Sequence, residues 1–168
     1  MDELQKYLAD IREGDRAAFE ALYECMKKPL YTIIWRITQD KALSEDILQD
    51  MFLKIYLTAP EPSANPRAYL CQMARNLAID SVRKRKPDVD LDKAENSLYD
   101  QADIPQRLDV ENAIKALPQQ DQQIVTLHIN GGLKFREVAA IVGIPLGTVL
   151  WSYQKAIKQL RITLGGTI

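Results

Sequence analysis

The sequence predicts an all-α protein made of two small helical domains. Apolar residues recur at intervals of three and four along most of the chain, and no segment shows the alternation of apolar and polar residues that is typical of a half-buried strand. An acidic stretch without sustained periodicity interrupts this pattern within the 168 residues. We therefore predict a first domain over residues 1–86, an acidic linker over 87–106 and a second domain over 107–168.

Four helices are predicted in the first domain, because capping and stop residues divide its apolar periodicity into four parts. The signals, in chain order, are Gly14 and Asp15 before the second helix, Asp40 or Ser44 before the third, and Asn65 with Pro66 before the fourth. The side chains expected to face the core are Phe19, Leu22, Tyr23, Met26, Leu30, Ile33, Ile34, Ile37, Leu43, Ile47, Met51, Ile55, Leu70, Met73, Ala74, Leu77 and Ser81.

The fourth helix carries a second, polar stripe that is mostly basic. Residues 67–87 contain six basic groups and one acidic group, although the whole chain has a net charge of -1. A run of charged residues in a helix more often forms a face exposed to solvent than a binding site. The four consecutive cations at Arg83–Lys86, however, repel one another unless an anionic partner lies beside them. We favour nucleic acid as that partner. The stripe consists of Gln72, Arg75, Asn76, Ile79, Arg83 and Lys86.

The second domain is predicted to contain four helices, of which the last two form a helix-turn-helix over residues 134–149. Val138, Ala139 and Val142 repeat at helical spacing, Gly143 can end the helix and Pro145 prevents it from continuing. The following helix, from about Thr148 to Leu164, is of the kind that enters a DNA major groove. Residues 112–168 contain six basic and two acidic groups, which suits that role.

Several other classes of protein are not indicated. No stretch approaches the roughly 20 apolar residues of a membrane span, and the first residues lack the order of a secretion signal. We expect a cytoplasmic protein without membrane insertion. Cys25 and Cys71 are expected to be structural thiols, and His128 a packed or surface residue. No nucleophile–base pair, metal cluster or phosphate loop is present, so we expect no enzyme activity, cofactor or metal.

The order of the motifs resembles the extracytoplasmic-function (ECF) group of the sigma-70 family of bacterial sigma factors. Residues 44–56, 65–70 and 73–80, followed by the basic run, are similar to conserved region 2. Ala116-Leu117-Pro118 and residues 144–149 are similar to region 4. The resemblance covers nearly the whole chain, and both sets of motifs in this order are hard to reach by accident.

The resemblance implies a contact between the third helix and the clamp helices of the RNA polymerase β′ subunit, and a second contact with the β flap. Carboxylates beside exposed apolar groups suit a basic and apolar partner helix. The alternative is that the acids only solvate the helix and that Phe52 belongs to the core. The residues that match the family motif for binding core polymerase are Asp46, Gln49, Asp50, Phe52 and Leu53.

For the fourth helix, the resemblance implies recognition of the minus-10 promoter element. A sigma factor holds one strand unpaired without ATP, which requires pockets for flipped bases and cations along the phosphates. The turn from Thr58 to Arg67 is expected to shape such a pocket. The residues expected to contact minus-10 DNA are Arg67, Tyr69, Arg75, Asn76, Arg83 and Lys84.

For the helix-turn-helix, the resemblance implies that the second helix reads the minus-35 element as duplex. Val149, Tyr153, Ala156, Ile157 and Leu160 are expected to face inward. Ser152 stands where many family members have arginine, so Ser152→Arg is expected to strengthen minus-35 binding. Lys134 replaces the usual capping Ser or Thr. The residues expected to face this DNA are Lys134, Arg136, Thr148, Trp151, Ser152, Lys155 and Lys158.

Together these features predict a transcription initiation factor that binds core RNA polymerase and promoter DNA and is controlled by an anti-sigma factor. Two alternatives remain open. The chain could be a helix-turn-helix regulator that acts independently of polymerase, which would require a ligand pocket or a dimer interface in residues 1–86. It could also be an adaptor that binds only protein, with its basic run covered by an acidic partner.

Overall fold

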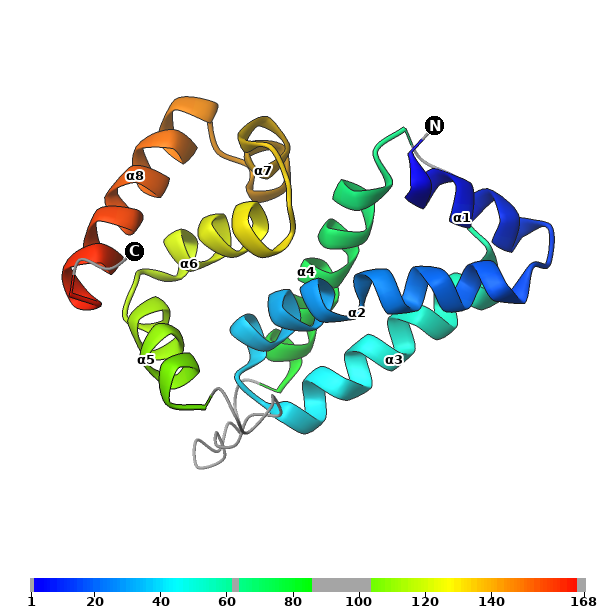
Figure 1. Cartoon of the computed structure of the whole chain (residues 1–168), viewed down its shortest axis with the longest axis horizontal. Coiled ribbons are helices and arrows are strands. Elements are labelled where there is room, and N and C mark those ends of the chain that lie inside the picture. Colours follow the sequence, from blue (N-terminus) through cyan, green and yellow to red (C-terminus); the bar gives the residue numbers. More distant parts are fainter. Residues whose placement is uncertain (1, 62–63, 86–103, 166–168) are drawn as a thin grey trace. The chain divides into compact units, whose positions relative to one another are not determined.

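A computed structural model of the chain describes residues 2–61, 64–85 and 104–165, with side chains described from residue 108 onward in the last range. Every regular element in these ranges is a helix (Figure 1). The chain divides into two compact units, Met1–Glu95 and Asn96–Ile168. The predicted all-α fold with two small helical domains is confirmed.

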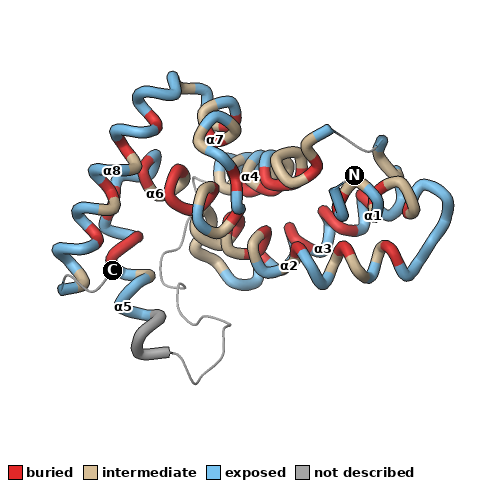
Figure 2. Tube along the Cα trace, turned by 45° about the horizontal axis from the view of Figure 1, so that its top comes forward, coloured by how far each residue is buried: buried red, intermediate tan, exposed pale blue. Residues whose placement is uncertain are grey.

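The N-terminal unit is a bundle arranged around its longest helix. It contains α1 (Glu3–Arg12), α2 (Arg16–Thr38), α3 (Lys41–Thr58) and α4 (Pro66–Lys84). Helix α2 packs against each of the other three. Buried positions recur at helical spacing along α2 (Figure 2). The fully buried side chains on this side of the helix include Leu22, Met26, Leu30 and Ile34.

Helix α2 continues through Pro29, although proline lacks the N–H group that an interior helical position donates. An interior proline costs about 3 kcal/mol relative to alanine. The helix persists because the next turns bury Leu30, Ile33 and Ile34, and each buried aliphatic side chain stabilises the fold by about 1.5–3 kcal/mol.

The predicted starts of α2 and α4 are confirmed by their caps. The Asp15 carboxylate accepts a hydrogen bond from the Ala18 N–H at 3.2 Å, directly after Gly14 has turned the chain at φ +90°. The Asn65 side chain accepts from the Ala68 N–H at 3.2 Å, and Pro66 occupies the first turn of α4.

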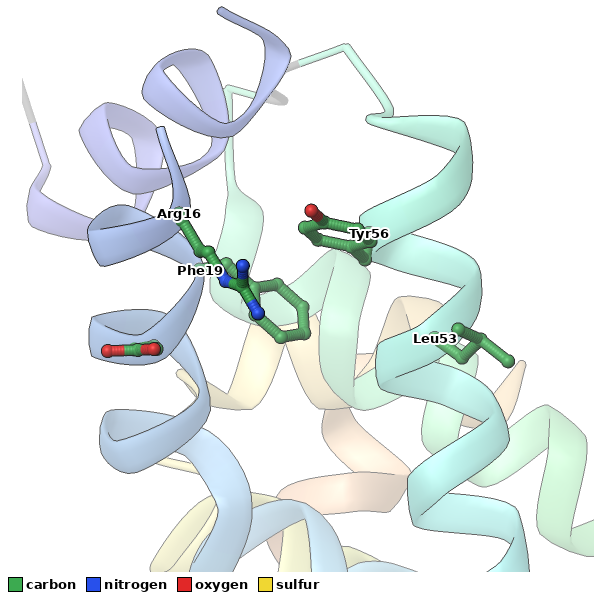
Figure 3. A pocket seen from close by; sticks show the side chains of 5 residues that line it. Arg16, Phe19, Leu53 and Tyr56 are labelled. Atoms are coloured by element: carbon green, nitrogen blue, oxygen red, sulfur yellow. The ribbon is translucent and has the colours of Figure 1, made fainter. Parts of the chain in front are cut away.

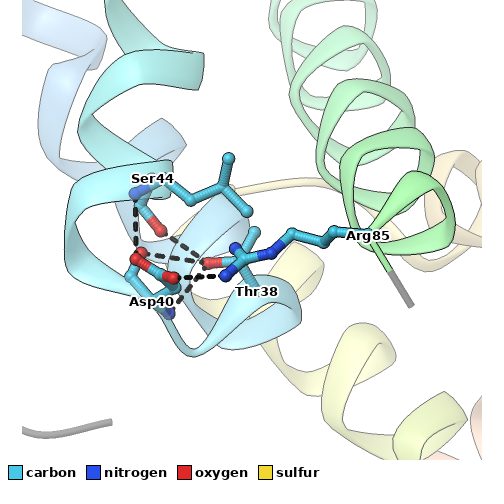
Figure 4. Close-up of polar contacts among 5 residues, drawn as sticks. Thr38, Asp40, Ser44 and Arg85 are labelled. Carbon is cyan, nitrogen blue, oxygen red and sulfur yellow. Dashed lines mark hydrogen bonds and ion pairs between the residues drawn. The ribbon is translucent and has the colours of Figure 1, made fainter. Parts of the chain in front are cut away.

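Asp40 caps the start of α3 and also pairs with Arg85 at the end of α4 (Figure 4). One carboxylate oxygen accepts from the Leu43 N–H at 3.0 Å, and the other lies 2.9 Å from the Arg85 guanidinium at the end of α4. Ser44, the alternative cap, is instead buried and shares a 2.6 Å hydrogen bond with Thr38. The negative group thus lies at a helix N-terminus and the positive group at a helix C-terminus, where both helix dipoles favour them.

The C-terminal unit contains α5 (Ile104–Lys115), α6 (Gln119–Val125), α7 (Phe135–Val142) and α8 (Leu146–Thr163). The first helix begins three residues before the predicted boundary at residue 107. Its outward residues Leu108 and Val110 stay exposed. The core brings α5, α6 and α8 together through Ala113, Ile114, Leu117, Val125, Ala156 and Leu160.

A π-helical turn, η4 (Thr126–Asn130), follows α6 and directs the chain toward α7. It places His128 in a cluster of rings from three elements. His128 stacks on Phe135 with ring centroids 4.0 Å apart, and Tyr153 meets both rings edge-on. The His128 Nδ1 donates to the Leu133 carbonyl at 2.8 Å. The interpretation of His128 as a packed residue is confirmed.

The two cysteines differ. Cys71 is buried, whereas Cys25 is exposed. No single helix in the described ranges is long and apolar enough to cross a membrane. In the same ranges, no three His, Cys, Asp or Glu side chains gather into a possible metal-binding set.

We predict that Asp40 stabilises the N-terminal unit in two separable ways. Asp40→Asn keeps the capping oxygen and loses the ion pair, so it should cost about 0.5–1 kcal/mol, as should Arg85→Gln. Asp40→Ala loses the cap as well and should cost about 1.5–2.5 kcal/mol. The measurement is urea unfolding followed by Trp35 fluorescence in a Trp151→Phe background.

The matched control is Arg83→Gln, since Arg83 forms only an exposed pair with Asp80 and should change the free energy of unfolding by less than about 0.5 kcal/mol. Equal losses for Asp40→Ala and Asp40→Asn would contradict the capping role.

Candidate protein and nucleic-acid interfaces

One side of α3 is an exposed stripe that combines acidic and apolar groups. Asp46, Gln49, Asp50, Leu53 and Leu57 are all exposed and recur at helical spacing, and we call this stripe the α3 face. Leu53 is 55% exposed and Leu57 is 70% exposed. Large apolar side chains with that much exposure beside carboxylates are typical of a protein-binding surface.

Phe52 does not belong to the α3 face, so its prediction as a polymerase contact is wrong. It is 3% exposed and packs edge-on against Tyr23, with ring centroids 4.9 Å apart, and against Phe19. The cause is its position in the helix. Phe52 follows the buried Met51 by one residue and precedes the buried Ile55 by three, so the inner side of α3 is wide enough to include it.

A shallow hollow lies beside the α3 face, between α2 and α3 (Figure 3). It has a volume of about 240 Å³ and is lined by Arg16, Phe19, Glu20, Leu53 and Tyr56. The rings of Phe19 and Tyr56 meet edge-on with centroids 5.0 Å apart. The floor is therefore aromatic and the rim carries one cation and one anion.

The outward stripe of α4 is polar, as predicted, and its members differ in exposure. Asn76 and Lys84 are exposed, and Arg83 lies 3.5 Å from Asp80 in an exposed pair. Arg75 is half-buried, and this burial lowers the pKa of its guanidinium. Arg67 and Tyr69 are half-buried in the first turn of α4. We call Arg75, Asn76, Arg83 and Lys84 the α4 face.

Part of the predicted minus-10 surface falls outside the described ranges or has another role. Pro62 and Ser63, within the expected pocket turn, are outside the described residues, as is Lys86. Arg85 belongs to the basic run, but its guanidinium pairs with Asp40 inside the unit. The run therefore offers fewer cations to an external partner than its sequence indicates.

Helices α7 and α8 form a helix-turn-helix. Their directions differ by 106°, within the range of about 90–120° for this motif. Gly143 ends α7 in the left-handed conformation at φ +77°, which glycine adopts without steric cost. The Glu137 carboxylate accepts from the Lys134 N–H at 2.8 Å, so the start of α7 is satisfied without a Ser or Thr cap.

Comparison with known proteins matches a separate family model to each of the two units. Residues 22–87 match the family model for sigma-70 region 2, and residues 107–160 match the model for sigma-70 region 4. The chain belongs to the sigma-70 family, in its ECF group. We refer to the two units as region 2 and region 4 from here on.

Curated relatives match along nearly the whole chain. The ECF RNA polymerase sigma factor SigW of Bacillus subtilis (strain 168) is 26% identical over 177 residues, which covers 94% of this chain and 95% of SigW. The ECF RNA polymerase sigma factor SigK of Mycobacterium ulcerans (strain Agy99) is 28% identical over 173 residues, covering 95% of this chain and 92% of SigK.

Two solved structures share the fold. CnrH, in complex with the cytosolic domain of CnrY, matches with a TM-score of 0.72 at 18% identity, over 99% of this chain and all of that one. The sigma factor RpoE of Bartonella quintana, in complex with the anti-sigma factor NepR, matches with a TM-score of 0.70 at 20% identity, over 89% of this chain and 98% of that one.

In region 4, the prediction that Ser152 faces DNA is wrong. Ser152 is 4% exposed. It follows Val149 by three residues and precedes Ala156 by four, and both of these side chains are fully buried. Three- and four-residue spacing places all three on one side of α8, which is the side that faces the core. The other predicted DNA-facing residues, Lys134, Arg136, Thr148, Trp151, Lys155 and Lys158, are exposed.

Lys155 is exposed but has a partner within region 4. Its Nζ lies 3.0 Å from Oδ2 of Asp121, which is 4% exposed in the first turn of α6. The same Nζ lies 5.0 Å from the centroid of the Trp151 ring. The predicted DNA contact of Lys155 thus competes with an internal ion pair.

Two exposed residues on the side of α8 that is expected to face DNA were not among the predicted DNA contacts. Gln154 lies with Trp151 and Lys158 on the side of α8 opposite the buried Val149, Ala156 and Leu160, and Leu150 lies at the edge of that side. We call Leu150, Trp151, Gln154 and Lys158 the α8 face. The helical period, applied to uncharged as well as charged positions, could have identified both residues.

Because Ser152 is buried, Ser152→Arg is not expected to strengthen minus-35 binding. We predict instead that this substitution destabilises region 4. An arginine there would place a charge and a longer side chain in a packed core, at a cost of at least about 2 kcal/mol. Urea unfolding followed by Trp151 fluorescence in a Trp35→Phe background measures this change.

Gln154→Arg is the matched control, because Gln154 is exposed and should accept arginine within about 0.5 kcal/mol. Stronger DNA binding by a stably folded Ser152→Arg variant would contradict the inward placement of this residue.

Proposed function

We propose that this sigma factor binds core RNA polymerase through the α3 face and contacts promoter DNA through the α4 face and the helix-turn-helix. The proposal rests on two surfaces of region 2 that differ in charge. The α3 face combines carboxylates with exposed leucines, whereas the α4 face combines cations with an amide. A protein partner suits the first and a nucleic acid suits the second.

The α3 face suits a partner helix that is basic and apolar. Asp46 and Asp50 are four residues apart and exposed, so two carboxylates can meet cations on successive turns of that helix. Leu53 and Leu57 continue the stripe and supply apolar area. The aromatic hollow beside Leu53 can accept one apolar side chain of the partner. The β′ clamp helices are the partner that the family resemblance implies.

The α4 face suits a single strand of DNA at the minus-10 element. Arg75, Arg83 and Lys84 provide positive charge over more than two turns of one helix, and Asn76 provides hydrogen bonds to bases. The half-buried Arg75 loses less side-chain freedom on binding than an exposed arginine would. Arg67 and Tyr69 extend this surface into the first turn of α4.

The helix-turn-helix suits duplex DNA at the minus-35 element. Lys134 and Arg136 are exposed at the start of α7, and Lys158 is exposed on α8. These cations can contact phosphates, and α8 itself can enter the major groove. The β flap is the second polymerase element that the family resemblance implies as a partner.

An anti-sigma factor is a further proposed partner. CnrH and RpoE, which share this fold, were each solved with a bound protein, and that protein is named as an anti-sigma factor in the case of RpoE. The exposed Leu53, Tyr56 and Leu57 of this chain form the apolar surface that such a partner would cover. An anti-sigma factor on these residues would exclude polymerase from the α3 face.

We predict that reversing the charge of the α3 face weakens binding to core polymerase. Asp46→Lys with Asp50→Lys replaces two attractive contacts by repulsive ones, so the Kd should rise at least about tenfold, which corresponds to about 1.4 kcal/mol. Titration of the labelled full-length chain with core RNA polymerase of the same organism measures the Kd.

Glu13→Lys with Glu24→Lys is the control, because it makes the same change in net charge at exposed positions outside α3. A wild-type Kd for the α3 variant would exclude the α3 face as the polymerase contact. Failure of the wild-type chain to bind core polymerase at all would leave the two alternatives, an independent regulator or an adaptor.

A further inference from the structure

The half of α8 that would enter DNA first contains no cation. Between Leu146 and Gln154 there is no lysine or arginine, and the first cation of the helix is Lys155. In a helix-turn-helix, residues from the N-terminal part of the second helix contact the base edges. The usual bidentate contact of arginine with guanine therefore has no donor in this part of α8.

Apolar groups occupy these positions instead. Trp151 is 63% exposed on the side of α8 opposite the core, and Leu150 is 38% exposed at the edge of that side. Neighbouring large apolar side chains that are exposed together form an apolar patch of the kind found at binding surfaces. The adjoining member of the α8 face is Gln154, whose amide can form two hydrogen bonds with adenine.

The Trp151 side chain has a contact that limits its orientation before DNA binds. The Lys155 ammonium lies 5.0 Å from the centroid of its ring and 3.0 Å from Asp121. The carboxylate of Asp121 is buried and belongs to another helix, so Lys155 is held from the interior of region 4. The cation–π contact extends this restraint to Trp151. A side chain ordered in advance loses less entropy on binding.

Among the bases, thymine alone presents a methyl group in the major groove, and apolar side chains recognise it. We propose that Trp151 reads minus-35 DNA through thymine methyl groups and that Lys155 is the positioning residue that orients its ring. Leu150 adds apolar area, and Gln154 selects adenine at a neighbouring pair. The phosphate contacts come from Lys134, Arg136 and Lys158. This inference rests on the proposed role of region 4 at the minus-35 element.

The proposal is tested with holoenzyme, made from the full-length chain and core polymerase. Duplexes are selected from a pool that is random at the minus-35 position, and the enriched duplex is then made with deoxyuridine in place of each thymine of this element. Deoxyuridine lacks only the methyl group. We expect A·T pairs to be enriched, and removal of the contacted methyl to raise the Kd about three- to tenfold.

Variants assign the effect to Trp151. Trp151→Ala should bind the thymine and deoxyuridine duplexes equally, whereas Trp151→Phe should keep part of the difference. Ile162→Ala is the matched control, since Ile162 is 73% exposed near the far end of α8, and it should keep the full difference. Lys155→Gln should reduce the ratio of the two Kd values, and Lys155→Arg, which preserves the charge, should restore it.

Three outcomes overturn the proposal. Equal Kd values for the two duplexes with the wild-type chain would exclude methyl readout while leaving minus-35 binding intact. An unchanged ratio in Trp151→Ala would assign the exposed tryptophan to another partner, such as a protein. Failure to enrich any sequence would overturn both this inference and the proposed minus-35 function, so the two failures are distinguishable.

Discussion

The packing of α1, α3 and α4 around α2 is the constraint on which the surfaces of region 2 depend. Each of these helices has one side that must leave water, and α2 provides the common apolar side against which they bury it. Once Met51 and Ile55 are fixed inward, the opposite side of α3 must carry Asp50 and Leu53 outward. The acidic and basic surfaces are therefore consequences of the core.

The same constraint acts in region 4, with one polar addition. The inward placement of Val149, Ala156 and Leu160 fixes which residues of α8 are exposed. Asp121 then joins α6 to α8 through a charged pair that is buried on one side and exposed on the other. Such a pair contributes little net stability unless it is well ordered. We propose that the main role of this ion pair is to orient the Trp151 ring through Lys155, and not to stabilise the fold.

Local signals predicted more of the fold than of the sites. Caps at Asp15, Asp40 and Asn65 depend on a few adjacent residues, and all three are present in the structure. The helical period identified most core positions, but it did not give the width of the buried side. That width depends on the neighbouring helices, and for this reason Phe52 and Ser152 were placed on the wrong side.

Contacts between distant residues could not be predicted from spacing. The pairing of Arg85 with Asp40 joins positions that are 45 residues apart, and Lys155 meets Asp121 across two helices. In both cases a cation that the sequence offered to DNA has an internal partner. The π-helical turn η4 likewise follows from tertiary packing, since it brings His128 against Phe135 and Tyr153.

The central claim is that the α3 face, the α4 face and the helix-turn-helix act together to start transcription at defined sites. The most direct measurement is reconstituted transcription from genomic DNA of the same organism, with core polymerase, the full-length chain and mapping of RNA 5′ ends. We expect a small set of start sites that depend on the chain and share upstream elements at fixed spacing. If the chain joins core polymerase and the 5′ ends remain those of core polymerase alone, these surfaces do not direct initiation.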